Sequence, residues 1–128
     1  MAFTRIGLNR RVLGDTAEEV AARFLRAQGF TIVLRNYRRR TGELDIIART
    51  GDVLVIAEVR TRSKLTHGGA AASVGTRKQR RIVRASLQLL QQRRDLAELR
   101  ARFDVLVVHE ACGSQPRIEW IQNAFSVP

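Results

Sequence analysis

The sequence has few of the residues that build disulfides, zinc sites or membrane spans. Its one cysteine, Cys112, cannot form an internal disulfide, and with two histidines it has no Cys/His cluster of the kind that binds zinc. No run approaches the ~18 apolar residues that a membrane span needs. The first residues contain no apolar segment typical of a secretory signal. We therefore expect a cytoplasmic protein with no membrane partner.

The chain is also poor in aromatic and acidic residues. Aromatic side chains make up 5%, which disfavours a surface that binds single strands by base stacking. Lys and Arg number 23 against 12 Asp and Glu, for a net charge of +11, and only Lys64 and Lys78 are lysines. Because a planar guanidinium suits phosphate oxygens, this imbalance favours a nucleic-acid partner. The alternative is an ordinary solvated surface of an arginine-rich protein.

What is present is the composition of one globular domain. The 128 residues are 45% hydrophobic and 27% charged. A chain of this length buries roughly two-thirds of its unfolded surface. We expect a basic N-terminal arm over residues 1–13 and a single domain over residues 14–128.

The predicted order of elements is α-β-β-β-α-β-β. A capping box at Thr16 and Glu19 predicts the start of one helix, which ends at Gly29, and Thr76 is expected to cap a second helix that runs to about Gln92. This order predicts an α/β or α+β fold, with a mixed sheet flanked by helices. The predicted strands are 30–36, 42–49, 53–61, 103–109 and 117–122, with a loop at 62–75 and a helical turn at 95–100.

Two carboxylates stand in apolar strands, where a basic protein has few acids to spare. Asp45 lies within an apolar strand, and Glu58 directly follows the apolar run 53–57. If the turn between these strands has two or four residues, the two carboxylates share a face, whereas a three-residue turn without a bulge separates them. Arg60 projects from the same face as Glu58. Their repulsion is relieved by a cation, either Arg60 or a divalent metal.

Glu18 is the third acidic residue that could join this pair. It lies beside the apolar stripe of the first predicted helix and can lean toward the sheet, whereas Glu19 points away. Oxygen ligands alone favour Mg²⁺ or Mn²⁺ over zinc. The alternative is a structural ion-pair network built around Arg60, and spacing alone leaves both interpretations open.

Short motifs are spread over residues 14–125. They are Gly14-x-x-x-Glu18, Asn36-x-Arg38, Gly42-Glu-Leu-Asp-Ile-Ile-Ala48, Val55-Ile-Ala-Glu-Val-Arg60-x-Arg62, Gly68-Gly69, Lys78-Gln79, Arg102-Phe-Asp-Val105 and Glu119-Trp-Ile-x-Asn-Ala-Phe125. In this order and spacing the chain resembles the YraN-like family of small uncharacterised bacterial proteins. That family resembles the restriction-endonuclease-like superfamily, especially the Holliday junction resolvases, which implies an α-β-β-β-α-β core.

The resemblance also implies a metal site. The superfamily motif is an Asp followed further along the chain by Glu-x-Lys; here Asp45 and Glu58 match its two acids. Arg60 stands where the superfamily has Lys, and it stays protonated because its pKa exceeds about 12. Glu18 matches a first-helix glutamate that resolvase-like members add to the site. The implied metal ligands are Glu18, Asp45 and Glu58, and the implied cofactor is Mg²⁺ or Mn²⁺.

Three further residues belong to these motifs. Lys78 or Gln79, at the start of the second predicted helix, matches a polar residue near the site in some members of the superfamily. Glu43 shares a face with Asp45, where it either supports the metal ligands or pairs with a nearby arginine. Arginine at position 60 can still stabilise negative charge on a phosphate in the transition state.

The expected function is that of a metal-dependent DNA endonuclease, with branched DNA such as a Holliday junction as one candidate substrate. Asp45, Glu58, Arg60 and Lys78 would be its catalytic residues. One alternative is a non-catalytic nucleic-acid-binding module with the nuclease fold, and another is an RNA- or ribosome-associated protein. A homodimer follows only by analogy with resolvases. The residues expected to bind phosphates are Arg35, Arg38, Arg39, Arg40, Arg62, Lys64, Arg77, Lys78, Arg80 and Arg81.

Overall fold

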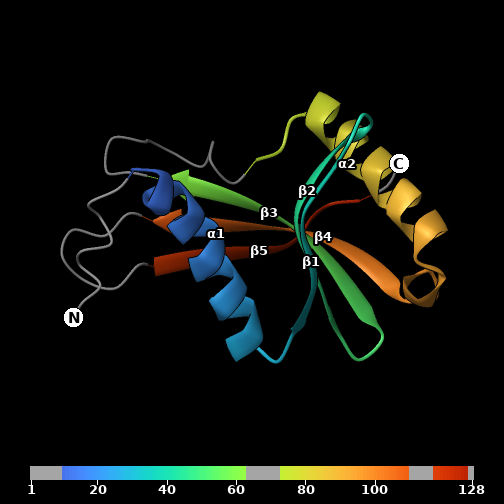
Figure 1. Cartoon of the computed structure of the whole chain (residues 1–128), viewed down its shortest axis with the longest axis horizontal. Helices are drawn as coiled ribbons and strands as arrows, with labels where there is room; N and C mark the ends of the chain where they lie inside the picture. Colours follow the sequence, from blue (N-terminus) through green and yellow to red (C-terminus); the bar gives the residue numbers. More distant parts are fainter. Residues whose placement is uncertain (1–9, 63–72, 110–116, 127–128) are drawn as a thin grey trace.

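A computed structural model describes residues 10–62, 73–109 and 117–126, with side chains from residue 17 onward. The observed order of elements confirms the predicted α/β fold with an α-β-β-β-α-β core (Figure 1). None of the helices in these ranges is long and apolar enough to cross a membrane. The elements are α1 (Arg10–Ala27), β1 (Thr31–Arg39), β2 (Gly42–Thr50), β3 (Val53–Arg62), α2 (Thr76–Gln92), the 3-10 helix η3 (Arg94–Leu96), β4 (Arg100–His109) and β5 (Arg117–Phe125).

Two predicted helix caps are wrong. α1 already includes Arg10, so Thr16 and Glu19 lie inside it and form no capping box, and residues 10–13 of the expected arm belong to the helix. α2 runs from Thr76 to Gln92 as predicted, but its N-cap is Gly75, which has no side chain to cap the helix, rather than Thr76. Capping residues are local signals that also occur inside helices, so they mark a helix start less reliably than its apolar stripe marks the helix itself.

The described strands form one mixed sheet in the order β1-β2-β3-β4-β5. β1, β2 and β3 pair antiparallel, β3 and β4 pair parallel across the α2 crossover, and β4 and β5 pair antiparallel. Thr50 pairs with Val53, so the turn between β2 and β3 has two residues. Gly51 adopts a φ of 56° there, which glycine tolerates without strain.

The two helices cover opposite faces of β3. Val55 and Ala57 belong to the apolar cluster that includes α1, whereas Leu54 and Ile56 belong to the cluster that includes α2. Neighbouring residues of a strand point to opposite faces, so both faces of this strand are covered. Figure 1 shows the two helices against different parts of the twisted sheet. The apolar run 53–57 predicted this burial.

Candidate functional site

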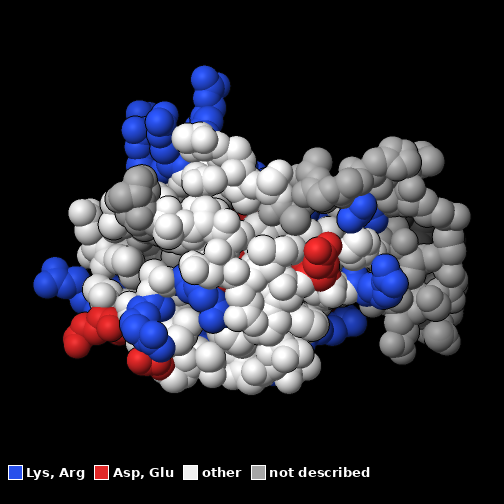
Figure 2. All heavy atoms as spheres, turned by 180° about the vertical axis from the view of Figure 1, so that it is seen from behind, with Lys and Arg blue, Asp and Glu red and all other residues white. Residues whose placement is uncertain are grey.

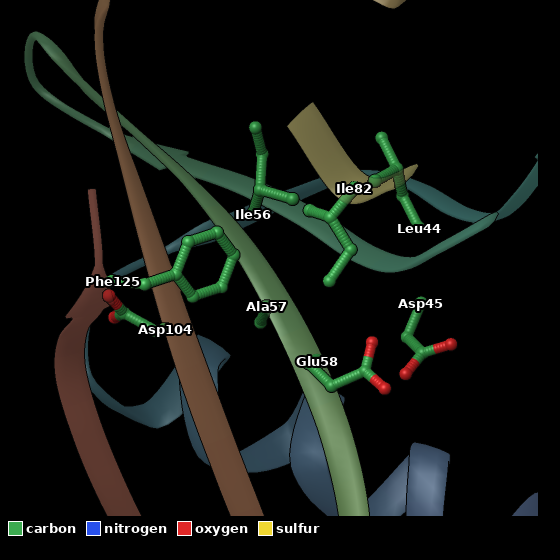
Figure 3. A pocket seen from close by; sticks show the side chains of 8 residues that line it. All are labelled: Leu44, Asp45, Ile56, Ala57, Glu58, Ile82, Asp104 and Phe125. Atoms are coloured by element: carbon green, nitrogen blue, oxygen red, sulfur yellow. The ribbon is translucent and has the colours of Figure 1, made fainter. Parts of the chain in front are cut away.

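Asp45 and Glu58 face each other where β2 and β3 separate. The pairing of these strands runs from Thr50–Val53 to Ile46–Ala57, and one more step in the same register places Asp45 opposite Glu58. Figure 3 shows both carboxylates in one pocket with apolar side chains. The two-residue turn therefore gives the shared face that the sequence allowed.

Asp45 is held by one direct hydrogen bond in this arrangement. The backbone N–H of Val59 donates to its Oδ2 atom at 2.8 Å. Burial, followed by the negative charge of Glu58, raises the pKa of Asp45 to about 6, and the charge of Glu18 acts in the same direction. The hydrogen bond from Val59 and the positive charge of Lys78 only partly oppose this rise in pKa. The fold thus brings together two carboxylates that repel each other. A divalent cation bound between them would relieve this repulsion.

Glu58 is in contact with two cationic side chains. Its side chain is 7% exposed, and its Oε2 atom lies 2.8 Å from Lys78 Nζ and 3.4 Å from Arg60 Nε. Lys78 reaches it from the first turn of α2. The cation nearest to this carboxylate is therefore the lysine on the helix rather than the arginine at the motif's lysine position.

Glu18 reaches toward this region from α1. Its Oε1 atom accepts hydrogen bonds from Asn36 Nδ2 at 2.8 Å and from Arg35 Nε at 3.1 Å. Asn36 has a φ of 55°, in the left-handed region that asparagine tolerates better than most residues. Asn36 stands opposite Asp45 in the pairing of β1 with β2. Its neighbours in the chain, Arg35 and Tyr37, pair with the neighbours of Asp45, which are Ile46 and Leu44.

Asn36 is a residue of this region that the sequence did not single out as a candidate site residue. Its only advance signal is its place in the motif Asn36-x-Arg38. Glu19 was expected to point away from the sheet, which is wrong, because it accepts a hydrogen bond from Arg35 at 2.9 Å. This bond is the largest cause of the lowered pKa of Glu19.

The residues present fit a magnesium or manganese ion at the Asp45–Glu58 pair. Among the described side chains, no group of three or more His, Cys, Asp or Glu lies close enough together to hold a metal ion. Glu18 is thus not assembled with the pair as a third direct ligand. Mg²⁺ is usually held by only one or two carboxylates, with waters and substrate phosphates as its other ligands. Two facing carboxylates satisfy that requirement.

Two other expected residues lie away from the pair. The Gln79 side chain donates to the backbone oxygen of Val74 at 2.7 Å, so it stabilises the start of α2. Glu43 is exposed and forms an ion pair with Arg38, with 2.8 Å between Oε1 and Nε. The arginine-pairing alternative for Glu43 is the one that the structure shows.

The two basic clusters of the sequence lie side by side in the fold. Thr41, between β1 and β2, donates to Gln88 of α2 at 2.9 Å. A Cβ atom at Gly42 would come within 2.5 Å of the Arg81 backbone oxygen, so only glycine permits this close approach. Figure 2 shows basic side chains projecting from this end of the molecule. We call this surface the basic face; its exposed members are Arg38, Arg39, Arg40, Arg77, Lys78, Arg80 and Arg81.

Three of the expected phosphate-binding residues lie outside the basic face. Arg35 is turned toward α1, where it pairs with Glu18 and Glu19. Arg62 is half-buried at the end of β3. Lys64 lies outside the described residues.

The fold and the site define an α/β protein with an α-β-β-β-α-β core and a carboxylate pair where two antiparallel strands separate. The chain belongs to the uncharacterised protein family UPF0102, whose sequence profile matches residues 17–108. This confirms the resemblance to YraN-like proteins.

Similar UPF0102 proteins occur in several bacteria. One from Aeromonas hydrophila is 48% identical over 88% of this chain and 83% of its own length. One from Desulforapulum autotrophicum is 44% identical over 88% of this chain and 92% of its own length. One from Hahella chejuensis is 46% identical over 89% of this chain and 90% of its own length. The similarity therefore covers most of each protein.

Proposed function

We propose that this protein is a metal-dependent endonuclease that hydrolyses phosphodiester bonds in DNA. The observation that carries the proposal is the pair of facing carboxylates, Asp45 and Glu58, in which burial and mutual repulsion raise the pKa of Asp45 to about 6. Strongly perturbed groups of this kind cluster at functional sites. The pair would hold Mg²⁺ or Mn²⁺, which supplies Lewis-acid activation of water and neutralises phosphate charge.

The chain's own residues supply the remaining functions. Arg60 stays protonated, so it would stabilise negative charge on the phosphate rather than remove a proton from water. Lys78 would contact the same phosphate from α2. Glu18, oriented by Asn36 and Arg35, would bind water at the edge of the site. Each role follows from charge and position, and none requires a base contact.

The basic face favours DNA binding through phosphates. Its arginines come from the β1–β2 hairpin and from α2, which begins at the carboxylate pair. Contacts to phosphate carry no sequence information, so recognition would depend on the shape of the DNA. Branched DNA, which presents phosphates on several arms, is the substrate that we propose to test first.

The test is a cleavage assay on four DNA structures: four-way junction, flap, duplex and single strand. Wild type, Asp45→Asn and Glu58→Gln are each assayed with Mg²⁺, Mn²⁺ or EDTA. We expect metal-dependent cleavage by wild type and a loss of about 100-fold or more in both variants. The matched control is Asp52→Asn, an exposed aspartate in the turn of the same hairpin, which should cleave like wild type. Cleavage that survives in both site variants would contradict the proposal.

A non-catalytic nucleic-acid-binding module is the second candidate. It is favoured by the ion pairs that Lys78 and Arg60 already make with Glu58. Metal titration separates the two functions, because a module of this kind would bind DNA without a divalent-cation site. Competition between junction DNA, duplex DNA and structured RNA at one fixed salt concentration would identify an RNA-binding protein instead.

A further inference from the structure

We infer that Lys78 is an internal counter-ion of Glu58, and that it exchanges this carboxylate for substrate phosphate when a divalent cation binds. This inference rests on the proposed function and adds a coupling between metal and DNA binding. It follows from one contact, the 2.8 Å between Lys78 Nζ and Glu58 Oε2.

A buried carboxylate needs a partner, and Glu58 has a removable one. Its side chain is 7% exposed, whereas the Lys78 side chain is 51% exposed. Lysine carries a compact ammonium on a flexible stem, so it can turn toward solvent without moving α2. Arg60, at 3.4 Å, remains beside the carboxylate but is the more distant cation. The Lys78–Glu58 ion pair can therefore separate with the loss of a single contact, the one between Nζ and Oε2.

Lys78 and a divalent cation compete for the same oxygen region. An ammonium 2.8 Å from Oε2 repels a second cation placed on that carboxylate. The lysine must turn away from Glu58 toward solvent, beside Arg77 and Arg80, which are exposed members of the basic face on the same part of the helix. A DNA phosphate at that face would give the displaced ammonium a new partner.

This exchange makes the two binding events help each other. Without phosphate, metal binding carries the cost of breaking the Lys78–Glu58 pair. With phosphate present, part of that cost is recovered, so metal affinity rises. By linkage, the metal must raise phosphate affinity by the same factor. Lys78 is thus a positioning residue for the metal site as well as a phosphate contact.

The first experiment measures Mn²⁺ affinity without DNA, by titration calorimetry on the full chain. Lys78→Gln should bind Mn²⁺ about 3- to 10-fold more tightly than wild type, because the competing cation is gone. Lys78→Arg keeps the charge and should stay near wild type. Arg84→Gln removes an exposed cation from the same helix and is the control, with a change below about twofold. Thermal unfolding of each variant verifies that it is folded.

The second experiment repeats the titration with a phosphorothioate-substituted DNA duplex, which resists cleavage and keeps its charge. Mn²⁺ bound by the duplex alone is measured separately and subtracted. DNA should raise the Mn²⁺ affinity of wild type by a larger factor than that of Lys78→Gln. Equal factors in the two proteins would overturn the inference.

The outcomes separate this inference from the proposed function. If wild type binds Mn²⁺ and Lys78→Gln binds it equally or more weakly, Lys78 is not a counter-ion that competes with the metal, and the nuclease proposal stands. If no variant binds Mn²⁺ with or without DNA, both proposals fail and the Lys78–Glu58 pair is structural.

Discussion

Two shielded aspartates in one sheet have opposite surroundings. Asp104, on β4, is buried, and each of its oxygens accepts two hydrogen bonds. The donors are Arg102, the Trp120 indole and the Asn123 backbone N–H, at 2.8–3.0 Å. Asp45, on β2, accepts one backbone hydrogen bond and faces another carboxylate. The fold satisfies the first charge fully, whereas the second faces a carboxylate that Lys78 and Arg60 contact.

This difference separates a carboxylate with a structural role from the one to which we propose a metal-binding role. Asp104 connects β4 to β5 next to an irregular register between Phe103 and Val105, where Asn123 has a φ of 52°. Its contacts with Arg102 and with the backbone of β5 are those of a structural partner. Asp45 connects β2 to β3 through the single hydrogen bond from Val59, and the raised pKa shows that its charge is less well stabilised than that of an exposed aspartate.

The largest expected effect is that of Asp104→Asn. An amide group would turn N–H donors toward Arg102 or Trp120 and leave buried donors without an acceptor. We expect a loss of about 3 kcal/mol in the free energy of unfolding, measured by urea denaturation at pH 7.5. An unchanged urea midpoint would mean that the hydrogen bonds around Asp104 contribute little to stability. The contrast between Asp104 and Asp45 would then not hold.

The same substitution at Asp45 should have the opposite sign. The folded-state pKa of about 6 exceeds the ordinary value of 3.8, so ionisation costs more in the folded chain than in the unfolded one. Asp45→Asn should therefore stabilise the protein by about 1–3 kcal/mol at pH 7.5, at roughly 1.4 kcal/mol per pKa unit.

The pH dependence gives this prediction its control. Because the folded chain binds the proton of Asp45 more tightly, the free energy of unfolding of wild type should fall, relative to Asp45→Asn, as the pH rises from about 4 to about 6. Below that range the two proteins should be closest in stability. A constant difference across the range would show that Asp45 titrates normally.

A smaller loss is expected for Trp120→Phe. This change removes the indole donor to Asp104 and reduces the edge-to-face contacts of the ring with Phe24 and Phe30. Three hydrogen bonds to Asp104 remain, so we expect a loss of about 1–2 kcal/mol by thermal or urea unfolding. A loss as large as that of Asp104→Asn would show that the indole dominates this network.

The smallest effect is a titration shift. Glu58→Gln removes a negative charge that raises the pKa of Asp45, so that pKa should move down toward its ordinary value. Burial remains and keeps it from returning fully. Carboxyl NMR on ¹³C-labelled Asp45 would measure the change. An upward shift would mean that the lost charge of Glu58 is outweighed by a rearrangement of Lys78.

Much of the fold was predictable because it is encoded by neighbouring residues. Alternating and continuous apolar runs predicted every described strand, although β1 and β5 end three residues later than expected and β4 begins three residues earlier. The helical turn predicted at 95–100 is the shorter 3-10 helix η3 at Arg94–Leu96. The two-residue turn at Gly51 was one of the turn lengths left open, and it is the one that brings Asp45 opposite Glu58. The start of α1 was missed because Thr16 and Glu19 match a capping pattern that can also occur inside a helix.

The candidate site was predictable as a set of residue types but not as a set of contacts. Lys78 was expected near the site, and the structure brings it to Glu58. Gln79, its neighbour, turns to Val74 instead, and Arg35 turns to α1. Which side chain of a helix turn reaches a strand depends on the crossover angle and on competing partners, and neither is present in local sequence.

The sequence by itself determined the elements, the hairpin that contains both acids, the excess of arginine and the membership of the family, because these depend on residue order and composition. Only the tertiary structure decided which cation meets Glu58 and which aspartate is satisfied. The parallel pairing of β3 with β4 places α2 over the carboxylate pair, and the pairing of β4 with β5 brings donors to Asp104. These contacts join residues far apart in the chain, so their energies are set by packing rather than by local preference.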